Sequence, residues 1–399
     1  MQSILILVLF FLATAEAVSP KAQVTHRVRR DSSDTSSQDG SNEGLIFAVN
    51  TDDPTTETKT DYFYTIPVVV GDTTLHLSIN TFASDIMVYE QQPNITLANI
   101  TLYQPSGGRM KDDKLTWLWT DGLFWACGTT VVRDVLGLGN LSISNQTLAV
   151  GNNDKSMPNS FPLGATVKQP WDGMLSLALQ GGSSIFSSTD ARPQKSWFEN
   201  IAPLLQAPVV SISLKHQAKG TIDFGGIDET MYTNDIYWTR ANTSSMGWMV
   251  HIKAYKIQGY DPTVVDWDVA IHTGSTWTWL EHDFVIEYLN VAGLEGAKSD
   301  MDDIYYQCNA HLPDLTLTMA SIDGKDFDVE IPGATLKAGD YGNGNCSLGL
   351  KPWTYNITAT PVRIMPFLGI SVLRSQYVAL NLTGPVVGFA QQVNPTANY

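Results

Sequence analysis

Residues 61–90 read DYFYTIPVVVGDTTLHLSINTFASDIMVYE, and the fold prediction starts from this stretch. Residues 65–70 are mostly β-branched, Gly71-Asp72 has the composition of a tight turn, and residues 75–80 alternate apolar with polar side chains. A β-hairpin is therefore expected. Its second strand would lead directly into a turn that begins at Asn80.

Short β-like segments recur along the rest of the chain, for example at 208–214 (PVVSISL), 314–319 (DLTLTM) and 385–390 (PVVGFA). Helical spacing is convincing only at 196–206 and 281–291. The pattern predicts a mainly β protein with a few short helices.

The composition restricts the class of protein further. The chain has 399 residues, of which 43% are hydrophobic and 16% charged, so it can fill the cores of two large lobes and is not mostly disordered. Acidic residues outnumber basic ones 40 to 24, which gives a formal net charge of −16. Such a charge repels phosphate backbones, so nucleic-acid binding is not expected.

The first residues look like a targeting signal. Residues 4–13 (ILILVLFFLA) are apolar but too few to cross a bilayer, and the small residues Ala15 and Ala17 stand where a signal peptidase cuts. We expect residues 1–17 to be a signal peptide; the alternative is a buried N-terminal helix. No later stretch is apolar enough for a membrane span, so the mature chain should lack one.

Residues 18–60 differ in character from the rest of the chain. Arg27-Val28-Arg29-Arg30 resembles a site for a basic-residue-specific processing protease, and the polar stretch after it lacks apolar residues for a core. The region is predicted to be a pro-segment or a flexible polar N-terminal region. The alternative is an exposed tail that is not cut.

Two further features fit the secretory route. Eight N-x-S/T sequons predict a glycoprotein: Asn94, Asn99, Asn140, Asn145, Asn242, Asn345, Asn356 and Asn381. Among the three cysteines, Cys308 and Cys346 enclose a loop of a size common for disulfides, and an oxidising compartment permits the bond. Cys127 would then be unpaired, as a buried inert thiol, a reactive thiol or an intermolecular bridge.

Two turns point to a family. Residues 78–84 (SINTFAS) resemble the first catalytic turn of the pepsin-like aspartic peptidases, family A1, which reads Asp-Thr-Gly-Ser after two apolar residues. Residues 270–276 (AIHTGST) resemble the turn that this family repeats in its second lobe. Asn80 and His272 stand at the positions of the two catalytic aspartates.

Five further motifs follow in the order in which they occur in the family: 171–178 (WDGMLSLA), 221–228 (TIDFGGID), Leu312-Pro313 after Cys308, 367–369 (FLG) and 386–390 (VVGFA). The resemblance therefore covers about 61–392. The resemblance implies a bilobal, pepsin-like acid-protease fold, with an N-terminal β lobe and flap at 61–235, a C-terminal β lobe at 236–393 and a tail at 394–399. It also implies a cleft for an extended polypeptide and the disulfide between Cys308 and Cys346. We expect a monomer.

The family's chemistry requires two carboxyl groups that touch, share one proton and thereby activate a water molecule. The amide of Asn80 does not titrate, so it cannot accept and return a proton. His272 can act as a base but has no acidic partner beside it in the turn. Both catalytic positions are therefore predicted to be non-functional. The alternatives are a misaligned turn with Asp85 as the working carboxylate, and His272 as a simple buried histidine. No metal or cofactor motif is present.

Some of the positions next to Asn80 and His272 carry the residues that are typical of the family. Thr81, Thr273 and Gly274 match the turns, and the threonines of this family hydrogen-bond across the two lobes. Phe82 replaces a glycine of the first turn. In the flap, Cys127-Gly128 stands where the family has Tyr-Gly.

We therefore expect a secreted, glycosylated, catalytically inactive member of this family that retains a polypeptide-binding cleft. It would be extracellular or in an acidic lumen of the secretory pathway. The alternatives are an active aspartic-type endopeptidase with a non-standard dyad and a storage or structural glycoprotein without a ligand.

Overall fold

The computed structural model describes residues 45–49, 64–90, 100–120, 125–128, 130–151, 171–187, 193–244, 246–300, 303–353, 365–397 and 399. The expected signal peptide, the basic cluster ending at Arg30 and the sequons at Asn94, Asn99 and Asn356 lie outside these residues. Within them, no helix has both the length and the apolar character that a membrane crossing requires.

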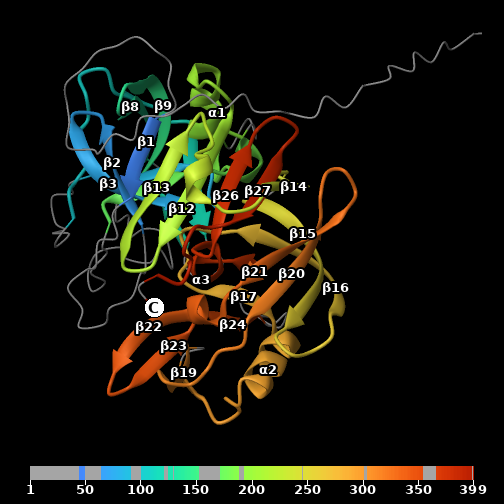
Figure 1. Ribbon diagram of the computed structural model, residues 1–399. Coiled ribbons are helices and arrows are strands. Elements are labelled where there is room, and N and C mark those ends of the chain that lie inside the picture. Colours follow the sequence, from blue (N-terminus) through green and yellow to red (C-terminus); the bar gives the residue numbers. More distant parts are fainter. Residues whose placement is uncertain are drawn as a thin grey trace, which may run out of the picture.

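The first half of the chain forms a lobe around one seven-stranded sheet with the order β2-β3-β10-β4-β9-β8-β5 (Figure 1). A second pairing, between β2 and β8, folds this sheet back on itself. The strands are β2 (Thr65–Val70), β3 (Thr73–Asn80), β4 (Ile86–Tyr89), β5 (Met110–Lys111), β8 (Thr130–Leu138), β9 (Leu141–Gly151) and β10 (Gly173–Ser176). A small sheet of β11 (Ile185–Ser187), β6 (Leu115–Thr120) and β7 (Trp125–Gly128) completes the lobe.

The second half forms another lobe around a seven-stranded sheet with the order β21-β20-β15-β16-β25-β17-β24. Its strands are β15 (Trp248–Ile257), β16 (Thr263–Ile271), β17 (Thr278–Glu281), β20 (Leu315–Ala320), β21 (Asp326–Ile331), β24 (Leu350–Trp353) and β25 (Phe367–Leu368). A four-stranded sheet joins β18 (Lys298–Asp300), β19 (Asp303–Gln307), β22 (Lys337–Gly342) and β23 (Asn345–Leu348). The predicted disulfide is confirmed: Cys308 is bonded to Cys346 with a Cα–Cα distance of 5.0 Å.

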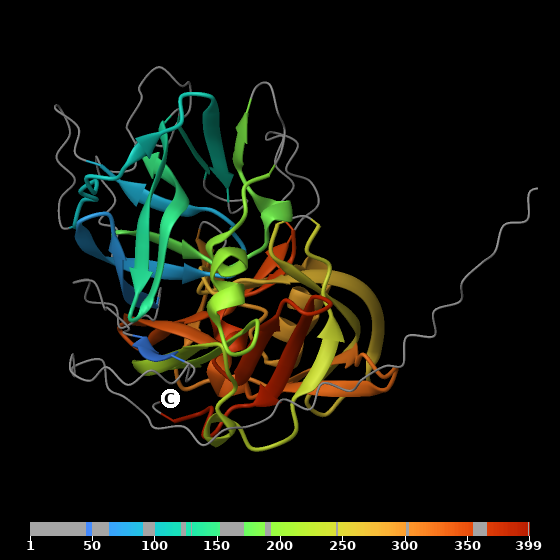
Figure 2. The same ribbon diagram turned by 90° about the horizontal axis from the view of Figure 1, so that it is seen from above.

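A six-stranded sheet connects the two lobes (Figures 1 and 2). Its order is β1-β13-β12-β26-β27-β14, and β12 pairs with β26 across a long sequence separation. The strands are β1 (Leu45–Val49), β12 (Val209–Lys215), β13 (Ala218–Phe224), β14 (Tyr237–Arg240), β26 (Gln376–Asn381) and β27 (Val386–Gln391). Since both halves contribute strands, the lobes share backbone hydrogen bonds and cannot separate without breaking this sheet.

Strand β1 requires a correction to the sequence prediction. Residues 45–49 (LIFAV) lie inside the region 18–60 that was predicted to be polar and flexible, yet they pair antiparallel with Gly220–Phe224. The stretch is short but apolar, and β13 offers it an otherwise open edge. The prediction of a flexible segment therefore does not hold for these five residues.

Both predicted helical segments are confirmed, and the fold is the mainly β, bilobal class that the sequence predicted. The segment 196–206 contains α1 (Trp197–Ile201), whose capping box joins Ser196 to Glu199, and the short 3₁₀ turn Ala202–Leu204. The segment 281–291 contains α2 (His282–Val291), which packs against β24 and β17. The third α-helix of the described residues is α3 (Ile370–Leu373).

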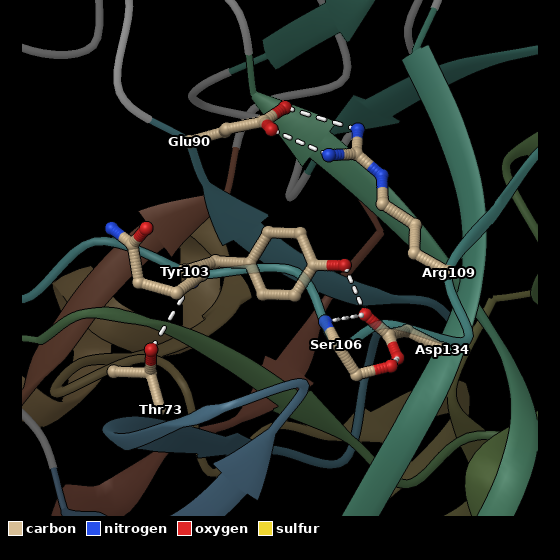
Figure 3. Close-up of polar contacts among 7 residues, drawn as sticks. Thr73, Glu90, Tyr103, Ser106, Arg109 and Asp134 are labelled. Carbon is tan, nitrogen blue, oxygen red and sulfur yellow. Dashed lines mark hydrogen bonds and ion pairs between the residues drawn. The ribbon is translucent and has the colours of Figure 1, made fainter.

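A buried carboxylate of β8 holds the segment from Tyr103 to Ser106 against the first lobe. Asp134 accepts hydrogen bonds from the Tyr103 hydroxyl at 2.5 Å and from the backbone and hydroxyl of Ser106 (Figure 3). It also accepts one from the Val135 backbone. Burial alone would raise the pKa of Asp134, but these hydrogen bonds outweigh burial and hold its pKa below the ordinary value. Arg109 packs over the Tyr103 ring and pairs with Glu90 through both terminal nitrogens.

We predict that Asp134→Asn lowers the free energy of unfolding by about 2 kcal/mol at pH 7, because hydrogen bonds to a charged acceptor are lost. Since the pKa of Asp134 is depressed in the folded state, its contribution is full above the unfolded pKa and disappears as pH falls through the folded pKa. Urea unfolding from pH 7 to pH 2 measures both effects. The matched control is Asp113→Asn at an exposed ion pair, and an equal loss in both variants would contradict the prediction.

Candidate functional site

Two strands, one from each lobe, deliver the two turns that the sequence singled out. Strand β3 alternates buried and exposed positions at first but is fully buried from Leu77 to Asn80. Strand β16 likewise becomes fully buried at its last three residues, just before His272. The change from alternation to continuous burial marks the point where each strand leaves the solvent-facing sheet and enters the junction of the lobes.

The turns are related by an approximate twofold symmetry. In the first lobe, β10 pairs parallel with β3, and the Ala178 backbone N–H donates to Ala83 at 3.0 Å. In the second lobe, β25 pairs parallel with β16, and the Ile370 N–H donates to Ser275 at 2.7 Å. Ala83 lies three residues after Asn80, and Ser275 lies three residues after His272. The two turns are therefore held in the same way.

Thr81 and Thr273 join the turns through four reciprocal hydrogen bonds. Each hydroxyl donates to a backbone carbonyl of the other lobe: Thr81 to Ile271 at 2.7 Å and Thr273 to Ile79 at 2.8 Å. Each hydroxyl also accepts the backbone N–H of the other threonine at 3.1 Å. Both side chains are buried, and the geometry fixes the two turns against each other.

The Asn80 side chain is used within its own turn. Its Oδ1 accepts the backbone N–H groups of Phe82 at 2.8 Å and Ala83 at 3.0 Å, an Asx-turn arrangement. Its Nδ2 contacts the Met174 sulfur at 3.5 Å. Asn80 is 3% exposed, and both hydrogen bonds of its oxygen are to backbone N–H groups.

His272 is a buried, neutral imidazole. Its Nδ1 accepts the Gly274 N–H at 3.2 Å, which places the proton of the neutral ring on Nε2. Burial lowers the pKa of His272 from 6.5 to about 3, and no charged group contributes to this shift. The ring is therefore uncharged over most of the pH range.

Aromatic rings enclose His272. The Phe82 ring stacks on it with a centroid distance of 4.7 Å and an interplanar angle of 15°, and the Phe367 ring meets it edge-on at 4.8 Å. We call these three residues the aromatic stack. The two phenylalanines belong to a wider apolar cluster with the buried residues Met249, Ala270 and Trp279 and the partly buried Met246, Trp277, Trp353 and Met365.

Close backbone approach explains Gly274. A Cβ atom at this position would lie 2.7 Å from Asn80 Nδ2 and 3.0 Å from His272 Cε1. The two side chains thus converge on one point, and only glycine leaves room for both. The structure brings together all six residues expected at the turns: Asn80, Thr81, Phe82, His272, Thr273 and Gly274.

Asn80 and His272 each accept hydrogen bonds from the backbone of their own turn. Within the described part of the chain, neither Asn80 nor His272 has a hydrogen bond or ion pair with a carboxylate. Asp85, the alternative candidate, instead accepts from Ser183 at 2.9 Å and from the backbone and hydroxyl of Ser184. The hydrogen bonds of Asp85 are therefore separate from those of Asn80 and His272.

The expected flap is a β-hairpin of β6 and β7, in which Cys127 pairs with Leu118 along the backbone. Gly128 is buried, and a Cβ atom there would lie 2.7 Å from the Trp117 indole nitrogen. The close packing explains a glycine at this position. Among the described cysteine, histidine and acidic side chains, the only group with metal-ligand spacing is Cys308, Asp340 and Cys346, which contains the disulfide.

Some contacts of the site were missed in the sequence. Met174 and Phe367 lie in motifs that were noted for the family resemblance, but neither was expected to touch Asn80 or His272. These contacts follow from the parallel pairing of β10 with β3 and of β25 with β16, which the two motifs imply. Gly247, whose φ is +75°, was also missed; a Cβ there would approach the Phe82 ring to 3.0 Å.

Two β-rich lobes, joined by a shared sheet and by a threonine-linked pair of turns, define the class of two-lobed acid-protease folds. The family model "Eukaryotic aspartyl protease" matches residues 61–392, and the chain therefore belongs to the eukaryotic aspartyl protease family.

Similar proteins agree with this assignment. The chain is 28% identical over 341 residues to aspergillopepsin-1 of Emericella nidulans, covering 85% of this chain and 80% of that protein. It is 26% identical to penicillopepsin-1 of Penicillium janthinellum, covering 84% of this chain and 97% of that protein. The crystal structure of an aspartic proteinase from Irpex lacteus shares the fold with a TM-score of 0.65 at 16% identity, covering 89% of this chain and 99% of that one.

The lowered pKa of His272 predicts acid sensitivity. Because the folded pKa lies below the unfolded pKa near 6.5, the unfolded state binds the proton first as pH falls. The difference in unfolding free energy between the natural protein and His272→Phe should therefore shrink from pH 6.5 downward, by at most about 1.4 kcal/mol per pH unit. Urea unfolding at pH 7, 5.5 and 4 tests this, and a difference that stays constant with pH would contradict it.

Proposed function

We propose that this protein is a catalytically inactive member of the aspartyl protease family that binds an extended polypeptide between its lobes. The observation that carries the proposal is the aromatic stack: apolar rings surround a neutral His272, and an amide stands opposite it at Asn80. Acid–base catalysis by this family needs two titratable oxygen acids in contact, and the described residues at these turns provide neither.

The fold supports the binding half of the proposal. The threonine bonds and the six-stranded sheet hold the lobes in the arrangement of the family. Extended peptides are recognised by backbone hydrogen bonds and side-chain pockets, and neither needs a catalytic acid. Loss of the dyad therefore does not by itself remove the capacity to bind.

An active enzyme with a non-standard dyad is the rival. It would need His272 as a base with an acidic partner, or Asn80 converted to aspartate by deamidation. Deamidation begins with attack by the next backbone nitrogen, and the Thr81 N–H donates to Thr273 Oγ1 instead. A storage or structural glycoprotein would share the fold but bind no peptide.

Secretion and glycosylation are part of the proposal. The apolar segment 4–13 and the disulfide suit the secretory pathway, with an extracellular or acidic luminal destination. Of the sequon asparagines in the described residues, Asn140, Asn145 and Asn242 are exposed, and Asn345 and Asn381 are partly exposed. All five therefore remain candidates for modification.

A restoration series tests the loss of catalysis. Asn80→Asp with His272→Asp should give little activity, because the Phe82 ring still covers the second position. Adding Phe82→Gly should raise cleavage of denatured protein at acid pH by a factor of about 10² or more over the natural protein, since each acid–base role contributes about 10²–10⁴. Inhibition by a transition-state mimic identifies the activity.

The matched control carries Asn80→Asp, Phe82→Gly and His272→Asn, which opens the same space but supplies one carboxylate. It should remain inactive. A folded triple variant without activity would show that more than the dyad was lost. Binding of an unstructured peptide library to the natural protein separates the proposed cleft from a glycoprotein without a ligand.

A further inference from the structure

A second buried carboxylate lies beside the first turn and takes no part in the threonine bonds or the aromatic stack. Asp85 directly precedes β4 and is 7% exposed. One of its oxygens accepts the Ser183 hydroxyl at 2.9 Å, and the other accepts the Ser184 hydroxyl at 2.9 Å and the Ser184 backbone N–H at 2.5 Å. These hydrogen bonds all come from the segment that leads into β11.

The surroundings of Asp85 supply hydroxyl and backbone groups but no counter-charge. Among the described residues, no basic side chain forms an ion pair with Asp85. Two charged residues, Lys195 and Glu199, follow on the elements that contact this segment, and neither has a hydrogen bond to Asp85. Burial raises the pKa of Asp85, and the hydrogen bonds from the two serines and from the Ile185 backbone offset burial only in part.

The segment that Asp85 holds supports the base of the β6–β7 hairpin, the expected flap. Strand β11 has three residues and pairs antiparallel with β6, so that Ile185 lies opposite Trp117 and Ser187 opposite Leu115. It is an edge strand of the small sheet, with β6 as its neighbour. Such a short strand gains little stability from its own pairing. The contacts at its entrance therefore contribute strongly to keeping it in place.

The protonation state of Asp85 changes the stability of this segment. A protonated carboxyl group can keep its serine partners, because a hydroxyl accepts as well as donates, and it buries no charge. An ionised Asp85 is a buried charge without a paired basic side chain, which favours opening of the segment to water. Since the folded pKa lies above the ordinary value of 3.8, this stability is full below that value and is lost as pH rises through the folded pKa.

We propose that Asp85 and its serine partners form a pH-dependent latch, which holds β11 against the base of the flap hairpin in acid and releases it near neutral pH. The latch acts on residues 183–187 and on the first residues of β6, and it leaves the threonine bonds between the lobes unchanged. It concerns the support of the flap alone. The inference is therefore independent of the proposed loss of catalysis and of peptide binding in the cleft.

Hydrogen exchange of the full-length natural protein at pH 4.5 and pH 7.5 tests the latch, with mass spectrometry of peptides and correction for intrinsic exchange rates. Protection of residues 183–187 and 115–117 should fall about tenfold or more from pH 4.5 to pH 7.5. The reason is that each pH unit above the folded pKa changes the opening equilibrium up to about tenfold. Asp85→Asn, which stays neutral, should show equal protection at both pH values within about twofold.

The matched control is Asp134→Asn, which changes the other buried carboxylate of this lobe, whose pKa is lowered. This variant should lose protection at 183–187 between the two pH values as the natural protein does. Strands β15 and β16 of the second lobe serve as the internal control. The proposal would be overturned by equal protection of 183–187 at both pH values in the natural protein. A loss that persists in Asp85→Asn, or that is equal in β15 and β16, would also overturn it.

A serine variant tests the latch without changing the carboxylate. Ser183→Ala with Ser184→Ala removes both hydroxyl donors, so protection of 183–187 at pH 4.5 should fall about fivefold or more. Protection of β15 and β16 should stay the same, which shows that the variant is folded. Unchanged protection at 183–187 in this variant would mean that the serines do not hold the segment, and the latch would be refuted.

Discussion

The hydrogen bonds between Thr81 and Thr273 are the constraint on which the rest of the structure depends. They lie where the last buried residues of β3 and β16 meet, and each threonine binds the backbone of the other lobe. Four buried hydrogen bonds fix the relative position of the two turns, and leaving any partner unsatisfied there would be costly. This constraint acts through hydroxyl and backbone groups, so it survives changes to the neighbouring side chains.

In the proposed inactive protein, side-chain packing at the positions next to those threonines takes the place of a proton-sharing pair. Asn80 caps its own turn, and His272 is held neutral between the rings of Phe82 and Phe367. Two carboxyl groups at these positions would face apolar rings in a buried site, which is unfavourable for a charged group. The side chains at 80, 82 and 272 are therefore consistent with one another, and the apolar ring at 82 suits an imidazole better than a carboxylate.

Sequence alone predicted the fold and the six turn residues, because ordered motifs and strand alternation are local patterns. It could not predict the contacts that depend on distant pairing. Phe367 reaches His272 only through the parallel pairing of β25 with β16, and residues 45–49 become a strand only because β13 offers an edge. Such contacts depend on which distant strands pair and in which register, and a local sequence pattern does not specify this.

In the proposed inactive protein, the lobe junction is intact while its proton chemistry is lost. The most direct measurement is peptide cleavage by the purified, glycosylated natural protein between pH 2.5 and pH 7.5, followed by mass spectrometry of a denatured protein substrate. We predict no cleavage above that of a heat-inactivated sample at any pH. Cleavage that is blocked by a transition-state mimic and abolished by Asn80→Ala or His272→Ala would contradict the claim.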